Sequence, residues 1–271
     1  MKTLKQQLIE ITKNNYVFPE GMDVNALADE MKDALTSPDG HLRDRLALEV
    51  FCKLIASKRL SGEKCHSLLH EFISDKYLLR GLGEECDDSV FGRAFCTYPI
   101  SSILGYNREA DSTFLTDDEI KNVLNAALKY LQEEKDFRYF VEAKGWADSI
   151  GHAADLFGAL ASEQVFGHDE LLLMLNAIRD KICIDYVCHG ANVFRLADSV
   201  QSIVSRELIS EQEFLSWVRS FFDYKKIGDD IKDARITYNR SEFFWSLSNR
   251  LKEKYPSFRA YTFNAFFELI E

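Results

Sequence analysis

The sequence predicts an all-α protein, an irregular solenoid of stacked antiparallel helix pairs. Turn-forming residues are scarce, with four prolines and thirteen glycines in 271 residues, which leaves long segments for helices. Similar helix starts recur at a period of roughly 40 to 50 residues, as in HEAT and armadillo arrays. Apolar residues follow the helical period in several windows. The clearest apolar stripe is Ile120, Val123, Leu124, Ala127, Leu128 and Leu131.

Residues 1–40 are expected to cap the array at its N-terminal end. Apolar positions with helical spacing predict two helices, separated by a turn at Pro19-Glu20-Gly21. These positions are Leu4, Leu8, Ile11, Val24, Leu27, Met31 and Leu35. Terminal units of a repeat array close its core against water, so their patterns are atypical.

Residues 41–222 are expected to form about four helix pairs. The second helix of a pair follows a capping signal, best seen in Thr116-Asp117-Asp118-Glu119, where the Thr and Glu side chains can satisfy free backbone amides. The same pattern recurs at Ser210 and, more weakly, at Ser61, and a fourth such helix is predicted around Glu170 to Ile182. The longer first helices are predicted near residues 42–57, 89–104, 146–161 and 192–206.

Residues 223–271 are expected to form the C-terminal cap. A helix from Arg240 to Leu251 is predicted to stop at Tyr255-Pro256, because proline is poorly tolerated inside a helix. No segment between 1 and 271 has the composition of a flexible linker. The whole chain is therefore expected to form a single repeat domain.

Composition excludes several classes of protein. The formal charge of −11 argues against a surface that follows nucleic-acid phosphates. The N-terminus lacks the apolar run of a signal peptide, and no segment has the ~20 apolar residues of a membrane span, so a cytoplasmic location is expected. The six cysteines lack zinc-site spacing and are expected to be free core thiols. No metal or cofactor is expected.

Basic residues occupy similar positions in successive predicted units. They are Arg45, Arg93, His152, Arg195 and Arg240. Aligned in a solenoid, they could receive an acidic or phosphorylated partner, because guanidinium groups bind such groups in a bidentate manner. The alternative, which we favour, is a set of structural ion pairs with Asp44, Asp88, Asp148 or Asp198.

Two segments, 84–95 and 144–156, combine small and charged residues where an apolar helix is expected. Gly92 and Gly151 each weaken a helix by roughly 1 kcal/mol relative to Ala, which predicts a close backbone approach at both. Asp88 and Ser89 are both good N-cap residues. Trp146 could stack on a ligand at a helix start, but a wedge between units is the preferred interpretation.

Asp148, His152 and Asp155 are spaced to share one helical face. A carboxylate beside an imidazole can orient a general base or hold a divalent metal. The simpler interpretation, which we favour, is a hydrogen-bonded polar group in the core.

These two segments resemble an uncharacterised bacterial family of all-helical proteins, a domain of unknown function with a DSVFGR-like run and a KGWAxxIxHAADL-like run. The resemblance extends from about Arg43 to Val218 and implies the fold and the motif positions, without a function. The matching residues here are Asp88, Ser89, Phe91, Gly92, Arg93, Lys144, Gly145, Trp146, His152, Asp155 and Leu156.

The leading functional expectation is a scaffold that binds a protein, peptide or anionic ligand in the groove of the stacked helices. Candidate ligand-binding residues are Asp88, Arg93, Lys144, Trp146, Arg45 and Arg195. An alternative is a hydrolase with His152 as base, Asp155 or Asp148 orienting it and Arg93 stabilising negative charge. A helical-repeat DNA glycosylase is a third possibility, which the acidic charge disfavours.

Overall fold

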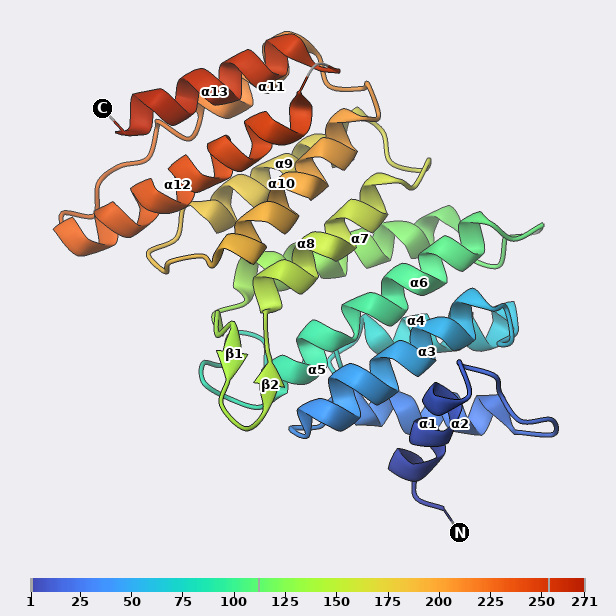
Figure 1. The fold of residues 1–271 in the computed structure, drawn as a ribbon. Helices are drawn as coiled ribbons and strands as arrows, with labels where there is room; N and C mark the ends of the chain where they lie inside the picture. The colour runs from blue at the N-terminus through green and yellow to red at the C-terminus, as the bar shows by residue number, and fades with distance from the viewer. Residues whose placement is uncertain (1, 112, 253, 271) are drawn as a thin grey trace. The chain divides into compact units, whose positions relative to one another are not determined.

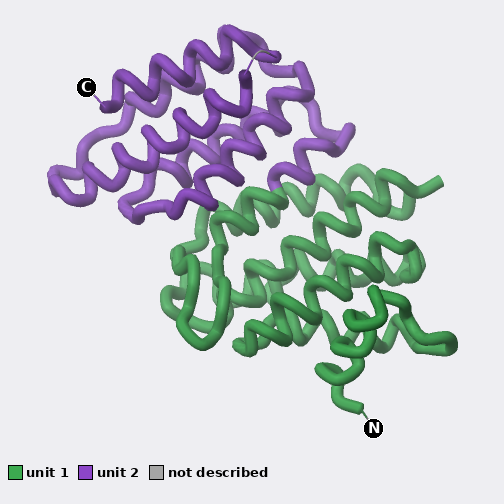
Figure 2. Tube along the Cα trace, in the orientation of Figure 1, with its two compact units in different colours: residues 1–156 green, residues 157–271 purple. Residues whose placement is uncertain are grey.

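The computed structural model describes residues 2–111, 113–252 and 254–270, and almost all of its regular structure is helical (Figure 1). The all-α prediction is thus confirmed. The chain divides into two compact units, residues Met1–Leu156 and Phe157–Glu271 (Figure 2).

The first unit begins with four helical segments: α1 (Leu4–Lys13), α2 (Val24–Ala34), a π-helical segment η1 (His41–Ala47) and α3 (Leu48–Ala56). They are followed by α4 (Gly62–Phe72), α5 (Ser89–Phe95), α6 (Thr97–Arg108), α7 (Asp117–Glu133) and the start of α8 (Ser149–Ala161). Helices α3 and α4 both pack against α6, and α1 and α2 pack against η1.

Local capping chemistry sets several of these helix starts. The Thr116 hydroxyl accepts the Glu119 backbone N–H, and the Glu119 carboxylate accepts the Thr116 backbone N–H, so the predicted capping box at α7 is confirmed. Ser61 caps α4 in the predicted place by accepting the Lys64 N–H.

The region before α8 differs from the prediction. Residues 146–148 were expected to start a helix, but Trp146 lies in a short antiparallel hairpin of β1 (Phe140–Val141) and β2 (Gly145–Trp146). The backbone explains the difference, since Gly145 has φ +87° and Asp148 φ +43°, both in the left-handed region that a right-handed helix excludes. Helix α8 therefore begins at Ser149.

The second unit contains the end of α8 and then α9 (His168–Ile182), α10 (Gly190–Val204), α11 (Glu211–Arg219), α12 (Asp230–Leu251) and α13 (Pro256–Ile270). Helix α12 packs against α10 and α13. The Ser210 capping box of α11 is confirmed. Helix α12 ends at Leu251, as predicted, and Pro256 is also the first residue of α13, which was not predicted. Proline fits this position because the amide it lacks has no partner in the first turn anyway.

An aromatic cluster forms the core of the second unit. The Trp217 ring lies edge-on to Phe221, with centroids 5.2 Å apart, and Phe221 stacks on Phe243 at 5.7 Å. The buried indole Nε1 of Trp217 donates to the Leu175 carbonyl, so its polar atom is satisfied.

The cysteines are free, as predicted. Cys65, Cys96 and Cys188 are buried, whereas Cys86 is exposed in the loop before α5. Burial raises the pKa of the Cys65 thiol to about 12, which keeps it protonated at neutral pH.

Within the described part of the chain, we find no helix that combines the length and the apolar character needed to cross a membrane.

Candidate functional site

A polar pocket of about 440 Å³ lies at the start of α5, within the first unit. It is lined by Thr36, Arg80, Gly81, Glu84, Asp87, Asp88, Ser89 and Gly92. Three of these residues carry carboxylates and one carries a guanidinium, so the lining has a negative balance. The first of the two compositionally distinct segments, 84–95, supplies most of the wall.

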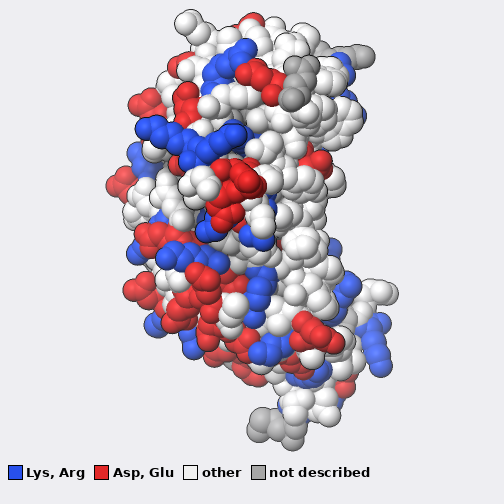
Figure 3. Space-filling model, turned by 90° about the vertical axis from the view of Figure 1, so that its left-hand side faces the viewer, with Lys and Arg blue, Asp and Glu red and all other residues white. Residues whose placement is uncertain are grey.

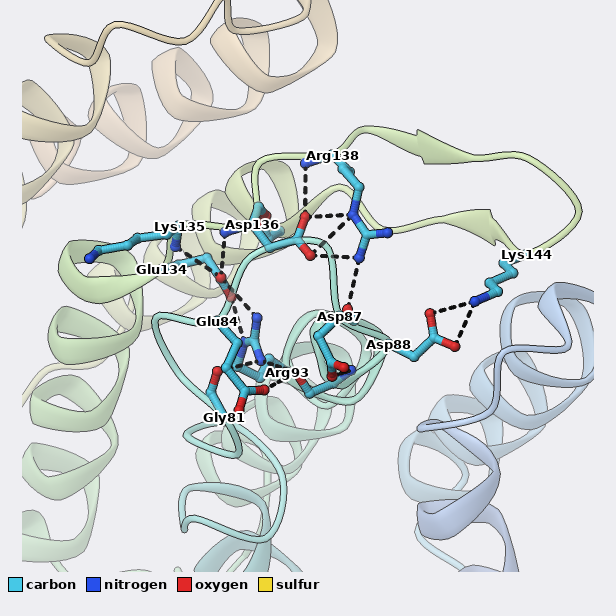
Figure 4. Close-up of polar contacts among 12 residues, drawn as sticks. Gly81, Glu84, Asp87, Asp88, Arg93, Glu134, Lys135, Asp136, Arg138 and Lys144 are labelled. Carbon is cyan, nitrogen blue, oxygen red and sulfur yellow. Dashed lines mark hydrogen bonds and ion pairs between the residues drawn. The ribbon is translucent and has the colours of Figure 1, made fainter.

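The Asp87 side chain begins the turn that leads into α5. It accepts the Ser89 backbone N–H at 2.7 Å, and this bond lowers the pKa of Asp87 below its ordinary value. Asp88, one of the two residues noted as good N-caps, makes no capping bond with its side chain, because its backbone is already helical (φ −72°, ψ −11°). Both Asp88 oxygens instead accept Lys144 Nζ, each at 2.8 Å (Figure 4).

Arg93 is fully buried beneath the pocket, and its guanidinium is bonded on every side. Its Nε and Nη2 donate to Glu134 at 2.6 and 2.9 Å, and its Nη1 donates to the Arg80 and Gly81 carbonyls and to Ser89 Oγ. Burial alone would lower the pKa of Arg93, but the Glu134 carboxylate raises it above its usual value. Arg93 therefore holds the wall of the pocket in place and is not available to a ligand.

The loop after α7 closes the same network from the other side (Figure 4). Glu134 Oε1 also accepts the backbone N–H groups of Lys135 and Asp136. Arg138 pairs with Asp136 at 2.6 Å and donates from Nη2 to the Asp87 carbonyl. Arg138, just before β1, and Lys144, in the turn between β1 and β2, thus link the hairpin to the loop before α5, residues 84–88.

Gly92 makes the close approach that its position in a helix predicts. A side chain at residue 92 would bring its Cβ to 3.0 Å from the Thr36 methyl group, which lines the same pocket. For Gly151 the prediction is not tested.

Arg43 is a central residue that the sequence analysis missed. It is fully buried, pairs with Asp44 and donates from Nη2 to the carbonyls of Lys144 (2.8 Å) and Trp146 (3.1 Å). Its guanidinium also lies 4.0 Å from the centre of the Phe91 ring. The sequence contained a signal for its burial. Arg43 lies three, four and seven residues before the buried Leu46, Ala47 and Val50, which places it at the start of the same buried helical face.

Arg45, which was selected in place of Arg43, points into solvent. Its side chain is 73% exposed and lies 3.8 Å from Glu49. Arg195 is half-buried, and Arg240 is buried with Nη1 donating to the Phe221 carbonyl. These arginines therefore do not share one environment, and the geometry does not support an open basic ladder. Over the described residues of the face shown in Figure 3, acidic and basic side chains are intermixed.

His152 lies away from the pocket lining, in the core. It is 5% exposed, its ring lies edge-on to Phe95 and Tyr98, and its Nε2 is 3.9 Å from Asp148 Oδ2, beyond hydrogen-bond distance. Asp155 is half-buried on the same helix. Since the Arg93 guanidinium is committed to Glu134, the proposed trio of His152, Asp155 and Arg93 is not supported by the geometry.

Trp146 was expected to wedge two units together, but its side chain belongs to the hairpin. It is 43% exposed, and its ring lies edge-on to Tyr139 and Phe140 at 4.9 and 5.0 Å. The backbone carbonyl of Trp146, rather than its ring, makes the long-range contact with Arg43.

Comparison with known protein families identifies the group to which the sequence is related. The family model described as "Protein of unknown function (DUF2785)" matches residues 78–248, which is more than half of the chain. The chain belongs to the DUF2785 family. The predicted membership of a family of unknown function is therefore confirmed. Searches of curated proteins and of solved structures found no match.

The DUF2785 match includes both compositionally distinct segments and almost the whole pocket lining. Thr36 and Arg43 precede the matched region. The pocket of this DUF2785 protein is thus built mainly by matched residues, and Thr36 completes its lining from outside the match.

Proposed function

We propose that this DUF2785 protein is a non-catalytic scaffold that binds a basic segment of a partner protein, with a Lys or Arg side chain entering the pocket before α5. The observation that carries the proposal is the charge of the lining. Glu84, Asp87 and Asp88 line a pocket of about 440 Å³, with Arg80 as the opposing charge in the lining and Lys144 already paired with Asp88. An aliphatic stem with a cationic head fits such a site in size and charge.

The cationic side chains near the pocket are already in ion pairs, which favours a basic ligand over an anionic one. Arg93, Arg138 and Lys144 are already paired with Glu134, Asp136 and Asp88. An anion would have to break one of these pairs or rely on Arg80 alone. The formal charge of −11 would also attract a basic partner over a longer range.

The scaffold part of the proposal includes the solenoid arrangement of helix pairs. This arrangement is supported by a contact that recurs in each unit, between a histidine and the glutamate of a capping box. His66 on α4 contacts Glu119 of α7, and His168 on α9 contacts Glu213 of α11 at 2.6 Å. In each unit, the second helix of one predicted pair contacts the start of the second helix of the next pair. This is the contact expected between successive repeats.

The geometry of the described residues favours neither enzymatic alternative. The hydrolase hypothesis needs His152 to be accessible, and it is 5% exposed. The glycosylase hypothesis needs a basic DNA-binding surface, which the charge of −11 disfavours.

A peptide-binding experiment tests the proposal. Fluorescence anisotropy is measured with labelled Gly/Ser peptides that carry a central Lys, Arg or Glu, at low and high salt. We expect binding of the Lys or Arg peptide, weakened by salt and by Glu84→Gln or Asp87→Asn. The matched control is Glu85→Gln, which removes a neighbouring exposed carboxylate outside the lining. Equal binding of the Glu peptide, or equal losses in the control, would overturn the proposal.

A further inference from the structure

Two histidines of α4 and one glutamate of α7 form a compact cluster on the first unit, separate from the pocket. His66 and His70 lie one helical turn apart, and both Nε2 atoms contact Oε1 of Glu119. The three potential ligand atoms all lie within 4.8 Å of one another. Two histidines four residues apart on a helix are the spacing that metal-binding helices use to place both rings on one ion.

The Glu119 carboxylate is held in position by its own helix cap. Its Oε2 accepts the Thr116 backbone N–H at 2.8 Å and the Thr116 hydroxyl at 2.9 Å, which leaves Oε1 directed at the two imidazoles. The carboxylate is therefore oriented by a second layer of hydrogen bonds, as metal-binding carboxylates usually are.

The geometry points to a divalent transition-metal site, and we propose that His66, His70 and Glu119 bind Zn²⁺. Zinc takes nitrogen and oxygen ligands at about 2.0–2.2 Å, so that tetrahedral ligand atoms lie roughly 3.3 Å apart. Both Nε2 atoms are already in contact with Oε1, and zinc binding requires the three atoms to adopt this spacing. Coordination uses the Nε2 lone pairs, so each ring then carries its proton on Nδ1.

The surroundings of the cluster indicate which role the metal has. The side chains of His66 and His70 are 40% and 48% exposed, so water can reach a fourth position and zinc can enter from solvent. The ligands come from two helices, and an ion would fasten the middle of α4 to the start of α7. The site is therefore a metal clamp that stabilises the first unit, and its zinc retains one solvent ligand.

The second unit contains a natural control for this proposal. His168 contacts the capping-box Glu213 as His66 contacts Glu119, and Ser210 holds Glu213 as Thr116 holds Glu119. The residue one turn after His168 is Leu172, so the second imidazole is missing there. A histidine–glutamate contact alone gives two ligands, which is fewer than zinc sites use.

The test uses the full-length protein without a polyhistidine tag, stripped with EDTA. Zn²⁺ binding is measured by competition with a chromophoric chelator, and Co²⁺ is used as a spectroscopic probe of coordination. We expect one tight equivalent of Zn²⁺, an intense visible d–d absorption with Co²⁺ and a zinc-dependent rise in Tm. His66→Ala, His70→Ala and Glu119→Gln should each weaken binding beyond the 10- to 100-fold typical of losing an outer-shell partner.

Two controls make the outcome decisive. Glu119→Gln retains the capping box, since Gln also serves at that position, so lost binding in this variant is not lost folding. His168→Ala removes an equivalent histidine–glutamate contact and should leave Zn²⁺ affinity unchanged. Wild-type binding no tighter than in the three ligand variants, or an equal loss in His168→Ala, would overturn the proposal.

Discussion

Arg93 and Glu134 form a buried, two-pronged ion pair, with Nε–Oε2 and Nη2–Oε1 distances of 2.6 and 2.9 Å. The pair joins α5 to the loop after α7, and both side chains are nearly inaccessible, at 0% and 3% exposure. Its role is therefore to hold the loop after α7 against α5.

Breaking this pair should destabilise the protein strongly. Arg93→Met leaves the Glu134 carboxylate buried without its guanidinium, which costs about 3–5 kcal/mol in comparable pairs. Urea denaturation measures the loss in the free energy of unfolding. Arg45→Met is the matched control, because the Arg45 side chain is 73% exposed, and its effect should stay within about 0.5 kcal/mol. A loss below about 1 kcal/mol for Arg93→Met would contradict the assigned role.

Glycine is required at residue 40, where the start of η1 meets the hairpin. A Cβ at Gly40 would lie 2.7 Å from the Lys144 carbonyl, so Gly40→Ala should cost about 1–3 kcal/mol and loosen the hairpin. Trp146 fluorescence and limited proteolysis in the hairpin report the loosening. Gly105→Ala meets only the tip of Arg108 at 3.9 Å in helix α6 and should instead stabilise by roughly 0.5–1 kcal/mol. Equal effects of the two substitutions would show that the Gly40 contact is not tight.

His168 should titrate above its ordinary range. The Asp169 and Glu213 carboxylates raise the pKa of His168, which is about 6.5 in unfolded chains. A group whose folded pKa is raised stabilises the fold fully below its unfolded pKa, and this contribution is lost as pH rises through the folded value. NMR titration of the imidazole should show the raised midpoint, and Asp169→Asn or Glu213→Gln should lower it. A midpoint at or below about 6.5 in the wild-type protein would contradict the contact.

A second metal site should be obtainable by one substitution. Leu172→His places an imidazole one turn after His168, which reproduces the spacing of His66 and His70 beside a capping-box glutamate. The variant should bind one more equivalent of Zn²⁺ than the wild-type protein, and Glu213→Gln should remove it. If the number of bound Zn²⁺ ions does not change, the side chain at position 172 does not reach Glu213 in the way that His70 reaches Glu119.

The helices and caps were predictable because their signals are local. The Thr116–Glu119 capping box spans four residues, and the apolar stripe that follows it is read directly from its spacing. Trp146 was placed in a helix because apolar spacing does not reveal a left-handed backbone at Asp148. The end of α12 ahead of Pro256 was predicted, but the start of α13 at Pro256 was not, because a proline can follow one helix and begin the next.

The partners of charged side chains were not predictable from local spacing. Arg93 was recognised, but Glu134 lies 41 residues away in a loop, so the pair depends on tertiary packing. The His66–His70 spacing was visible, yet the third member of the cluster, Glu119, was interpreted only as part of a cap. In the folded protein, the Glu119 carboxylate contacts the cap residue Thr116 and also the two histidines of α4.

The contact of Arg43 with the Lys144 carbonyl joins residues that are 101 positions apart in the chain. Ribosomes add about 5–20 residues per second, so the buried guanidinium is synthesised about 5–20 s before its acceptor exists. During this interval, η1 of the nascent chain cannot reach its final packing. The packing of Arg43 in the first unit is therefore completed only after the hairpin has been synthesised.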